Sequence, residues 1–303
     1  MKKVYIMYLL LLMSFFTFSG CANNKKILNN KSNDSKLNVV VSFNPLREFV
    51  EYIGKDKVDV KVIIPEGTEP HDFEPKAKDL LVLNNSDIFI YNGFGMENWI
   101  DKTVENIDNK NLVLVEASKG CQGIKTTKDE EHNYSEYDPH TWLGLSTAIV
   151  QGNNIKEALI KADPTNKEVY ENNYKEFKNK LSTLLQEYKN KFSSLNNKSF
   201  VTGHAAFAYF CRDFGLKQNS VEGVFAEGEP TPKKMKELVE YCKRNNVKTI
   251  FVEEMASPKV SETLAKEVNA KVKTIYTMES KEENKNYIQS MEENIKAVYE
   301  SLK

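Results

Sequence analysis

Hydrophobic and polar positions alternate along the first half of the chain in a strand and helix series. Short β-branched or alternating runs predict strands at residues 37–42, 58–64, 88–91 and 112–115. Apolar residues at helical spacing predict helices at residues 46–53, 75–84 and 96–107. Strands that alternate with helices in this way indicate βαβ units and a parallel sheet.

A long helical pattern follows, over residues 147–195. Asp163-Pro164 divides it, because proline opens helices far more readily than it sits inside them. The second piece, residues 165–195, would be about 46 Å long as one helix. The alternative is two helices with a break near Lys180.

The alternation then restarts, with strands predicted at residues 199–202, 247–252 and 272–276 and helices at 205–214, 231–245, 258–268 and 287–302. The predicted fold class is therefore α/β: two lobes with parallel-type sheets flanked by helices, joined by one long linking helix. Parallel sheets bind ligands beyond the carboxyl ends of their strands, so we expect the functional site in the cleft between the lobes.

The N-terminus reads as a targeting segment. Lys2 and Lys3 precede an almost wholly apolar stretch, residues 4–18, which has the length of a secretory signal core and is too short to span a bilayer. Ser19-Gly20-Cys21 resembles a bacterial lipobox, which would make Cys21 the site of lipid attachment. A secretory signal cut elsewhere and an uncleaved anchor are the alternatives.

These patterns divide the chain into five parts. We expect a lipoprotein signal peptide at 1–20, a polar flexible tether at 21–36, an N-terminal α/β lobe at 37–163, the long linking helix at 164–195 and a C-terminal α/β lobe at 196–303. A lipid on Cys21 would place the protein outside the cytoplasm, anchored to the bacterial cell membrane.

Composition excludes several classes of protein. The chain has 303 residues, 42 of them Lys or Arg and 43 Asp or Glu, for a net charge of −1. The composition excludes collagen-like and disordered chains, and the near-zero net charge excludes a general nucleic-acid binder. Beyond Cys21 the cysteines are Cys121, Cys211 and Cys242, without C-x-x-C spacing, so a thiolate zinc cluster is not supported. Cys211 and Cys242 could form a disulfide or be buried free thiols.

Three of the four histidines occupy the same kind of place. His71, His140 and His204 lie at the carboxyl end of a predicted strand or in a loop that leaves one. Taken singly, each would be an ordinary surface or partly buried histidine; together, three neutral imidazoles nearly complete a tetrahedral Zn²⁺ shell. Glu279, after the last predicted strand, is the expected fourth ligand, with a water as the alternative. His132 lies in an acidic, polar loop and is expected at the surface.

The ring nitrogen of each histidine that does not bind the metal should donate its N–H to a carboxylate or a backbone oxygen, which orients the ring. Asp138 is the candidate beside His140, and Glu69 or Asp72 beside His71.

At these residues the sequence resembles the ZnuA, AdcA and TroA group of solute-binding lipoproteins, which deliver zinc or manganese to ABC importers. The resemblance rests on E-P-H-D-F-E-P, D-P-H-T-W-L, T-G-H-A-A-F-A-Y-F and T-M-E-S, which put the ligand roles on His71, His140, His204 and Glu279. It extends over about residues 37–303. It implies a cargo metal in the cleft, a membrane permease as partner and no enzyme activity. We expect a monomer.

The resemblance also bears on the metal. Manganese-type members carry a carboxylate at the third position, where this chain has His204, and nitrogen-rich sites favour Zn²⁺ over Mn²⁺. A manganese-type binding protein is the first alternative. A His₃ zinc hydrolase would need a general base, such as Glu279, Glu227 or Glu253, but H-E-x-x-H is absent. A lipid-anchored adhesin with a structural metal is the third.

Overall fold

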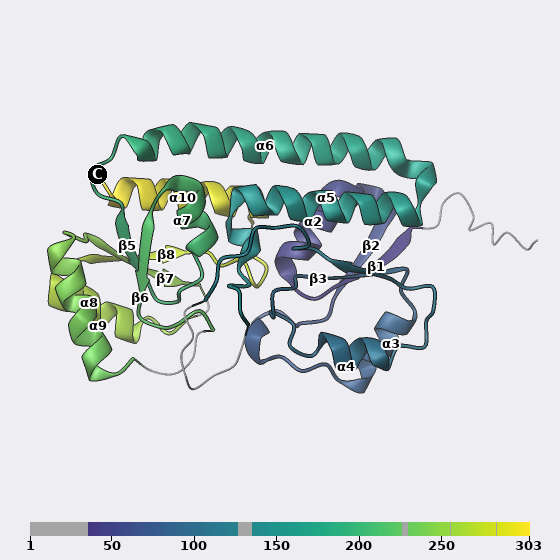
Figure 1. Ribbon diagram of the computed structural model, residues 1–303, viewed down its shortest axis with the longest axis horizontal. Coiled ribbons are helices and arrows are strands. Elements are labelled where there is room, and N and C mark those ends of the chain that lie inside the picture. The colour runs from purple at the N-terminus through teal and green to yellow at the C-terminus, as the bar shows by residue number, and fades with distance from the viewer. Residues whose placement is uncertain (1–35, 127–134, 226–229, 255, 283) are drawn as a thin grey trace, which may run out of the picture. The chain divides into compact units, whose positions relative to one another are not determined.

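Two four-stranded parallel sheets organise the protein in the computed structural model, which describes residues 36–126, 135–225, 230–254, 256–282 and 284–303 (Figure 1). Lys36–Lys303 forms one compact unit. The predicted signal peptide, Cys21, nearly all of the tether, His132 and Glu227 lie outside the described residues. The predicted α/β fold class, with two parallel sheets flanked by helices and one long helix, is confirmed.

The first sheet has the strand order β2-β1-β3-β4, and every pair is parallel. Its strands are β1 (Leu37–Val41), β2 (Val58–Val62), β3 (Ile88–Tyr91) and β4 (Val113–Glu116). Its helices are α2 (Asn44–Gly54), α3 (Ala77–Asn84) and α4 (Ile100–Glu105). These elements and their connections are called the first lobe below. The central strands are apolar and buried, as expected for a parallel sheet covered on both faces.

The second sheet repeats this order as β6-β5-β7-β8, again all parallel. Its strands are β5 (Ser199–Thr202), β6 (Lys217–Ser220), β7 (Thr249–Glu253) and β8 (Lys271–Ile275). Its helices are α7 (Ala208–Phe214), α8 (Pro232–Arg244), α9 (Lys259–Val268) and α10 (Tyr287–Ser301), and together these elements form the second lobe. The strand order reverses between β1 and β3 in the first sheet and between β5 and β7 in the second. Open α/β sheets bind ligands at such a reversal, beyond the carboxyl ends of the strands.

Two helices connect the sheets, α5 (Leu145–Ala162) and α6 (Lys167–Ser193). The 27 residues of α6 run for about 40 Å without a break at Lys180. In Figure 1, α6 lies above α5 at one end and above α10 at the other. It packs against α2 and α5 and also against α7 and α10, so it braces both lobes. Among the described helices, none is long and apolar enough to cross a membrane.

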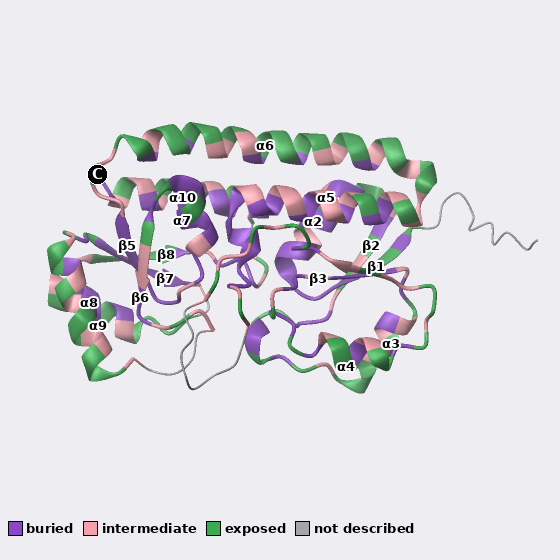
Figure 2. Ribbon diagram, viewed as in Figure 1, coloured by how far each residue is buried: buried purple, intermediate pink, exposed green. Residues whose placement is uncertain are grey.

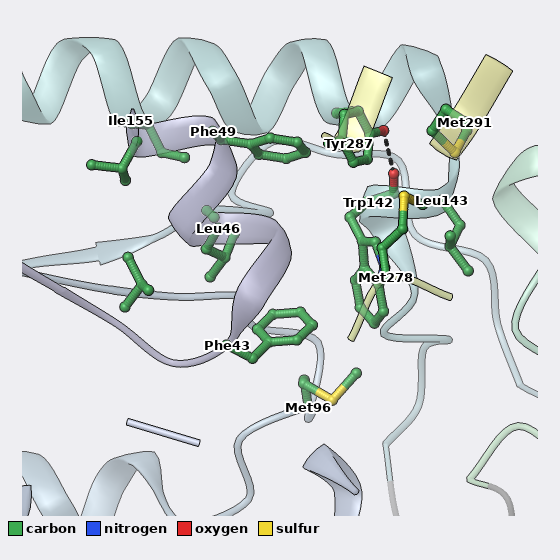
Figure 3. Packing of buried hydrophobic residues seen from close by; sticks show 14 of the residues in the cluster. Phe43, Leu46, Phe49, Met96, Trp142, Leu143, Ile155, Met278, Tyr287 and Met291 are labelled. Atoms are coloured by element: carbon green, nitrogen blue, oxygen red, sulfur yellow. Dashed lines mark hydrogen bonds between the residues drawn. The ribbon is translucent and has the colours of Figure 1, made fainter. Parts of the chain in front are cut away.

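The larger of two clusters of buried hydrophobic residues runs through both lobes, and the smaller one lies within the second lobe. The buried side of α6 faces the other helices, as the purple bands of Figure 2 show. Figure 3 shows Phe43 and Trp142, both from the first lobe, beside Met278 of the second lobe, and all three are almost fully buried. The Tyr287 hydroxyl donates to the carbonyl oxygen of Trp142 at 2.6 Å, which ties α10 to the centre.

The structure differs from the predicted elements in two places. The helix predicted over residues 96–107 is reduced to α4, because residues 93–99 form turns in which the Glu97 carboxylate accepts the backbone N–H groups of Asn92 and Gly93. Strand β6 was not predicted, because its sequence K-Q-N-S is polar; it is an edge strand that pairs only with β5.

The structure decides between a disulfide and free thiols for the cysteines that it describes. Cys121, Cys211 and Cys242 are free thiols, the last two buried, so the possible Cys211–Cys242 disulfide is absent from the structure.

Candidate metal centre

Three histidines that are far apart in the sequence converge at one point. His71 lies in a 3₁₀ turn (Pro70–Asp72) after β2, His140 directly precedes another (Thr141–Leu143), and His204 follows β5 by two residues. One ligand nitrogen of each lies within 4.8 Å of the others, and all three residues are buried. In the part of the chain that the structure describes, this is the cluster of His, Cys, Asp and Glu side chains able to hold a metal ion.

The spacing of two of these rings fits zinc. The Nε2 atoms of His71 and His140 are 3.3 Å apart. Two nitrogens that each lie about 2.0–2.1 Å from a tetrahedral Zn²⁺ are separated by about 3.3 Å. The two imidazoles therefore need little movement to share one ion.

His140 is oriented by a buried carboxylate, as predicted. Its Nδ1 donates to Asp138 Oδ1 at 2.9 Å, and its backbone N–H donates to the same oxygen at 2.8 Å. The Tyr209 hydroxyl in turn donates to the carbonyl oxygen of Asp138 at 2.6 Å. With the proton on Nδ1, the lone pair of Nε2 is free for a metal. Burial raises the pKa of Asp138 to about 7.

The turn that carries His71 is closed by Glu69, whose side chain accepts the backbone N–H of His71 at 3.3 Å. Of the two predicted candidates, Glu69 thus bonds the backbone N–H of His71 and not the His71 ring. The ring of Phe225 packs edge-on against the His71 ring, with centroids 5.4 Å apart.

His204 is held through its backbone by groups from both neighbouring strands. Its N–H donates to Glu253 Oε1 at 2.9 Å, and its carbonyl oxygen accepts from Gln218 Nε2 at 2.8 Å. A Cβ at Gly203 would lie 2.3 Å from Glu253 Oε2, so only glycine permits this close approach. The His204 ring places Nε2 2.8 Å from the carbonyl oxygen of Val224.

Burial keeps these rings uncharged. It lowers the pKa of His140 and of His204 to about 3 and that of His71 well below its ordinary value. Because a metal binds only the neutral imidazole, the site is ready for a cation at neutral pH without losing protons from its histidines.

Glu279 is buried but does not belong to the group of three as the side chains are placed. Its Oε2 accepts from the Thr277 hydroxyl at 3.1 Å, while Oε1 is buried without a hydrogen-bond partner. Burial and the negative charges of Glu69 and Glu254 raise the pKa of Glu279 well above its usual range. A buried carboxyl group in this environment is stabilised by either a proton or a cation.

The sequence did not single out the residues that hold the ligand loops. Gln218 lies on the unpredicted strand β6, and Asn44 and Trp142 contact the Glu279 loop across more than 130 positions of sequence. Glu253 was considered only as a base for a hydrolase, whereas its Oε1 is bonded to the His204 backbone. No spacing pattern signals such partners, because the fold alone brings them together.

Comparison with known proteins agrees with this geometry. The family model described as "Zinc-uptake complex component A periplasmic" matches residues 39–301. The high-affinity zinc uptake system protein ZnuA of Bacillus subtilis is 37% identical over 302 residues, 95% of this chain and 94% of the relative. The zinc-binding lipoprotein AdcA of Streptococcus pneumoniae is 34% identical over 98% of this chain, which spans 60% of the relative.

A solved structure has the same fold. The laminin-binding protein Lmb of Streptococcus agalactiae, described as a bifunctional protein with adhesin and metal transporting activity, superposes with a TM-score of 0.80 at 34% identity. The match covers 88% of this chain and 100% of that one.

Proposed function

Because this chain belongs to the zinc-uptake complex component A family, we propose that it captures Zn²⁺ outside the cytoplasm and delivers it to an ABC import permease. The ligands are His71, His140 and His204, with Glu279 as the fourth. The observation that carries the proposal is the convergence of three buried, neutral imidazoles from both lobes on one point.

The donor set favours zinc over manganese. Imidazole nitrogens suit Zn²⁺, whereas Mn²⁺ prefers sites rich in oxygen. Three nitrogens and one carboxylate would give a closed tetrahedral shell, which leaves no open position for a reacting water. Glu279 fits the fourth place because its Oε1 is buried and lacks any other partner. The family is one of solute-binding components and not of enzymes, so the ion is the cargo.

Capture links the two lobes, because His71 and His140 come from the first lobe side of the cleft and His204 from the second. The long helix α6 packs on both lobes, so the rearrangement on binding should be small. Zinc then shifts the population toward the form that docks on the permease.

We further propose the arrangement of the whole chain. Residues 1–20 are a signal peptide, Cys21 carries a lipid, and residues 21–36 are a tether to the membrane; a relative of the chain is itself named a lipoprotein. Residues 37–163 and 196–303 are the two lobes, residues 164–195 are the linking segment, and the protein acts as a monomer.

A metal titration by calorimetry tests the proposed site, with a matched control among the four histidines. The wild-type protein should bind one Zn²⁺ tightly and Mn²⁺ weakly. His204→Ala should lower the Zn²⁺ affinity by at least about 100-fold, since it removes one of four ligands. His132→Ala, which removes the one histidine that is not in the proposed ligand set, should bind as the wild type does. Equal affinity of His204→Ala and wild type would refute the site.

A further inference from the structure

The segment that carries Glu279 belongs to the second lobe by sequence but is hydrogen-bonded to the first. This segment, residues 277–280, follows β8. Trp142 Nε1 donates to the carbonyl oxygen of Thr277 at 2.7 Å. Asn44 Nδ2 donates to the carbonyl oxygens of Met278 at 2.9 Å and of Ser280 at 3.0 Å.

Further contacts with the first lobe surround these bonds. The Gly67 N–H donates to Ser280 Oγ at 2.8 Å, and the Lys281 N–H donates to Glu66 Oε2 at 2.6 Å. Met278 has a positive φ of 61°, and its buried side chain lies beside Trp142 in Figure 3. An L-residue rarely adopts this backbone conformation unless its surroundings impose it.

The second lobe holds the same segment by its opposite polar groups. The side chain of Glu254 accepts the N–H of Thr277 at 3.0 Å and the N–H of Met278 at 2.9 Å. Thr277 and Met278 therefore each direct their N–H group to the second lobe and their carbonyl group to the first. Met278 and Ser280 directly precede and follow Glu279, and the carbonyl groups of both accept from Asn44 Nδ2.

Asn44 is well placed to act as a brace. It is the first residue of α2 and is only 2% exposed. Its Oδ1 accepts from the Arg47 guanidinium, and its Nδ2 also contacts Glu48 Oε1 at 3.1 Å, which fixes the amide plane. The donors of this amide thus point at the Glu279 segment with a defined orientation.

We propose that Asn44 is a positioning residue for the metal site: by bracing the carbonyl groups of Met278 and Ser280, it presents the Glu279 carboxylate in the frame of the first lobe. The inference deepens the proposed function and rests on Glu279 as the fourth ligand. His71, His140 and Glu279 are then held by contacts with the first lobe. Glu279 is also held by the second lobe through Glu254, and His204 is held by the second lobe through Glu253.

The chain offers a matched control for this brace. Asn154, on α5, donates through Nδ2 to the carbonyl oxygens of Ala117 and Lys119, each at 2.8 Å. These carbonyl groups follow β4, which holds the same place in the first sheet as β8 in the second. The residue type and the pairing with alternate carbonyl groups are the same, but the braced segment carries none of the proposed ligands.

The test is a Zn²⁺ competition titration of wild type, Asn44→Ala and Asn154→Ala. Asn44→Ala should weaken Zn²⁺ binding roughly 10–100-fold, the usual effect of losing a group that orients a ligand. Asn154→Ala should leave the affinity unchanged. Equal affinities of Asn44→Ala and wild type would overturn the inference, as would an equal loss in both variants.

A double-mutant cycle with Glu279→Ala separates positioning from general structure. If Asn44 acts through Glu279, Asn44→Ala has no further effect in the Glu279→Ala background. The visible spectrum of bound Co²⁺ should also change in Asn44→Ala toward that of Glu279→Ala. An unchanged spectrum, or an independent and additive loss, would contradict the proposal. Asn44→Ser, which removes the amide donors without burying a charge at the start of α2, gives the same readouts if Asn44→Ala does not fold.

The outcomes distinguish this inference from the proposed function. Weakened binding in Glu279→Ala together with wild-type affinity in Asn44→Ala overturns only the role of Asn44. Wild-type affinity in Glu279→Ala removes the fourth ligand and the inference with it, but leaves the three-histidine site intact.

Discussion

At the scale of single residues, the site depends on polar groups that are buried and almost completely paired. The sequence predicted His71, His140, His204 and Asp138, because each lies at or near the end of a strand in a loop shaped by proline or glycine. The partner of His204 was not predictable in that role, since Glu253 is 49 positions away. The local pattern thus indicated the candidate ligands and Asp138, which is two positions from His140, whereas the group that holds the His204 backbone depends on a long-range contact.

Replacing Asp138 by Asn should weaken zinc binding about 10–100-fold. The amide can no longer stabilise the positive charge that develops on the His140 ring when it binds a metal. Competition titration measures the change. Asp213→Asn is the control, because Asp213 is a buried carboxylate that bonds Ser146 and not a histidine. Equal losses in the two variants would exclude a specific role of Asp138.

Glu253 should make the stability of the metal-free protein depend on pH. Burial raises its pKa from 4.5 to about 8 in the folded protein. Because the pKa of Glu253 is higher in the folded protein than in the unfolded chain, the carboxyl group stabilises the folded protein fully at pH values below 4.5. This contribution is lost as the pH rises from 4.5 through about 8. Wild type should therefore lose about 5 °C or more of Tm relative to Glu253→Gln between those limits. Thermal melts of both variants would contradict this if the difference in Tm stayed constant.

At the scale of elements, helix α6 joins the two lobes by one buried face. Tyr170, Phe177, Leu181, Tyr188 and Phe192 are its buried residues, and their spacing keeps them on one side of the helix. The pattern predicted this helix, and the possible break near Lys180 is absent because Phe177 and Leu181 continue the same apolar face. Strand β6 was missed for the opposite reason: a polar edge strand carries no hydrophobic period.

Phe177→Ala should lower the free energy of unfolding by about 3–5 kcal/mol. The side chain is 1% exposed and packs edge-on against Phe49 of α2 at a centroid distance of 5.2 Å, and its ring occupies the space that a Cβ at Gly152 of α5 would enter. Guanidinium chloride unfolding measures the effect, and the exposed neighbour Lys178→Ala serves as control. The zinc stoichiometry should stay at one, because Phe177 does not contact the site; a change in stoichiometry would show that α6 shapes the cleft directly.

At the scale of the whole molecule, the two sheets have the same strand order, and the larger hydrophobic cluster and the proposed site draw on both lobes. The sequence predicted the two lobes, because alternating strand and helix patterns occur on both sides of residues 147–195. It could not predict that residues 277–280 bond to the opposite lobe, since those contacts join groups 135 to 236 positions apart.

Removal of zinc should leave the protein folded. A large cluster of buried hydrophobic side chains packs through both lobes without any contribution from a metal, so folding should not require the ion. Far-UV circular dichroism before and after chelation should be nearly the same, and zinc should raise Tm in proportion to its affinity. A loss of helical signal on chelation would favour a structural metal, as in a metal-stabilised adhesin.

Anomalous diffraction at the zinc absorption edge, from crystals of the zinc-loaded protein, shows whether one zinc ion is held between the lobes by His71, His140 and His204. We expect a single zinc peak about 2.0–2.1 Å from one ring nitrogen of each histidine, with the Glu279 carboxylate completing the shell. A peak elsewhere, or one that reaches fewer than three of these rings, would contradict it.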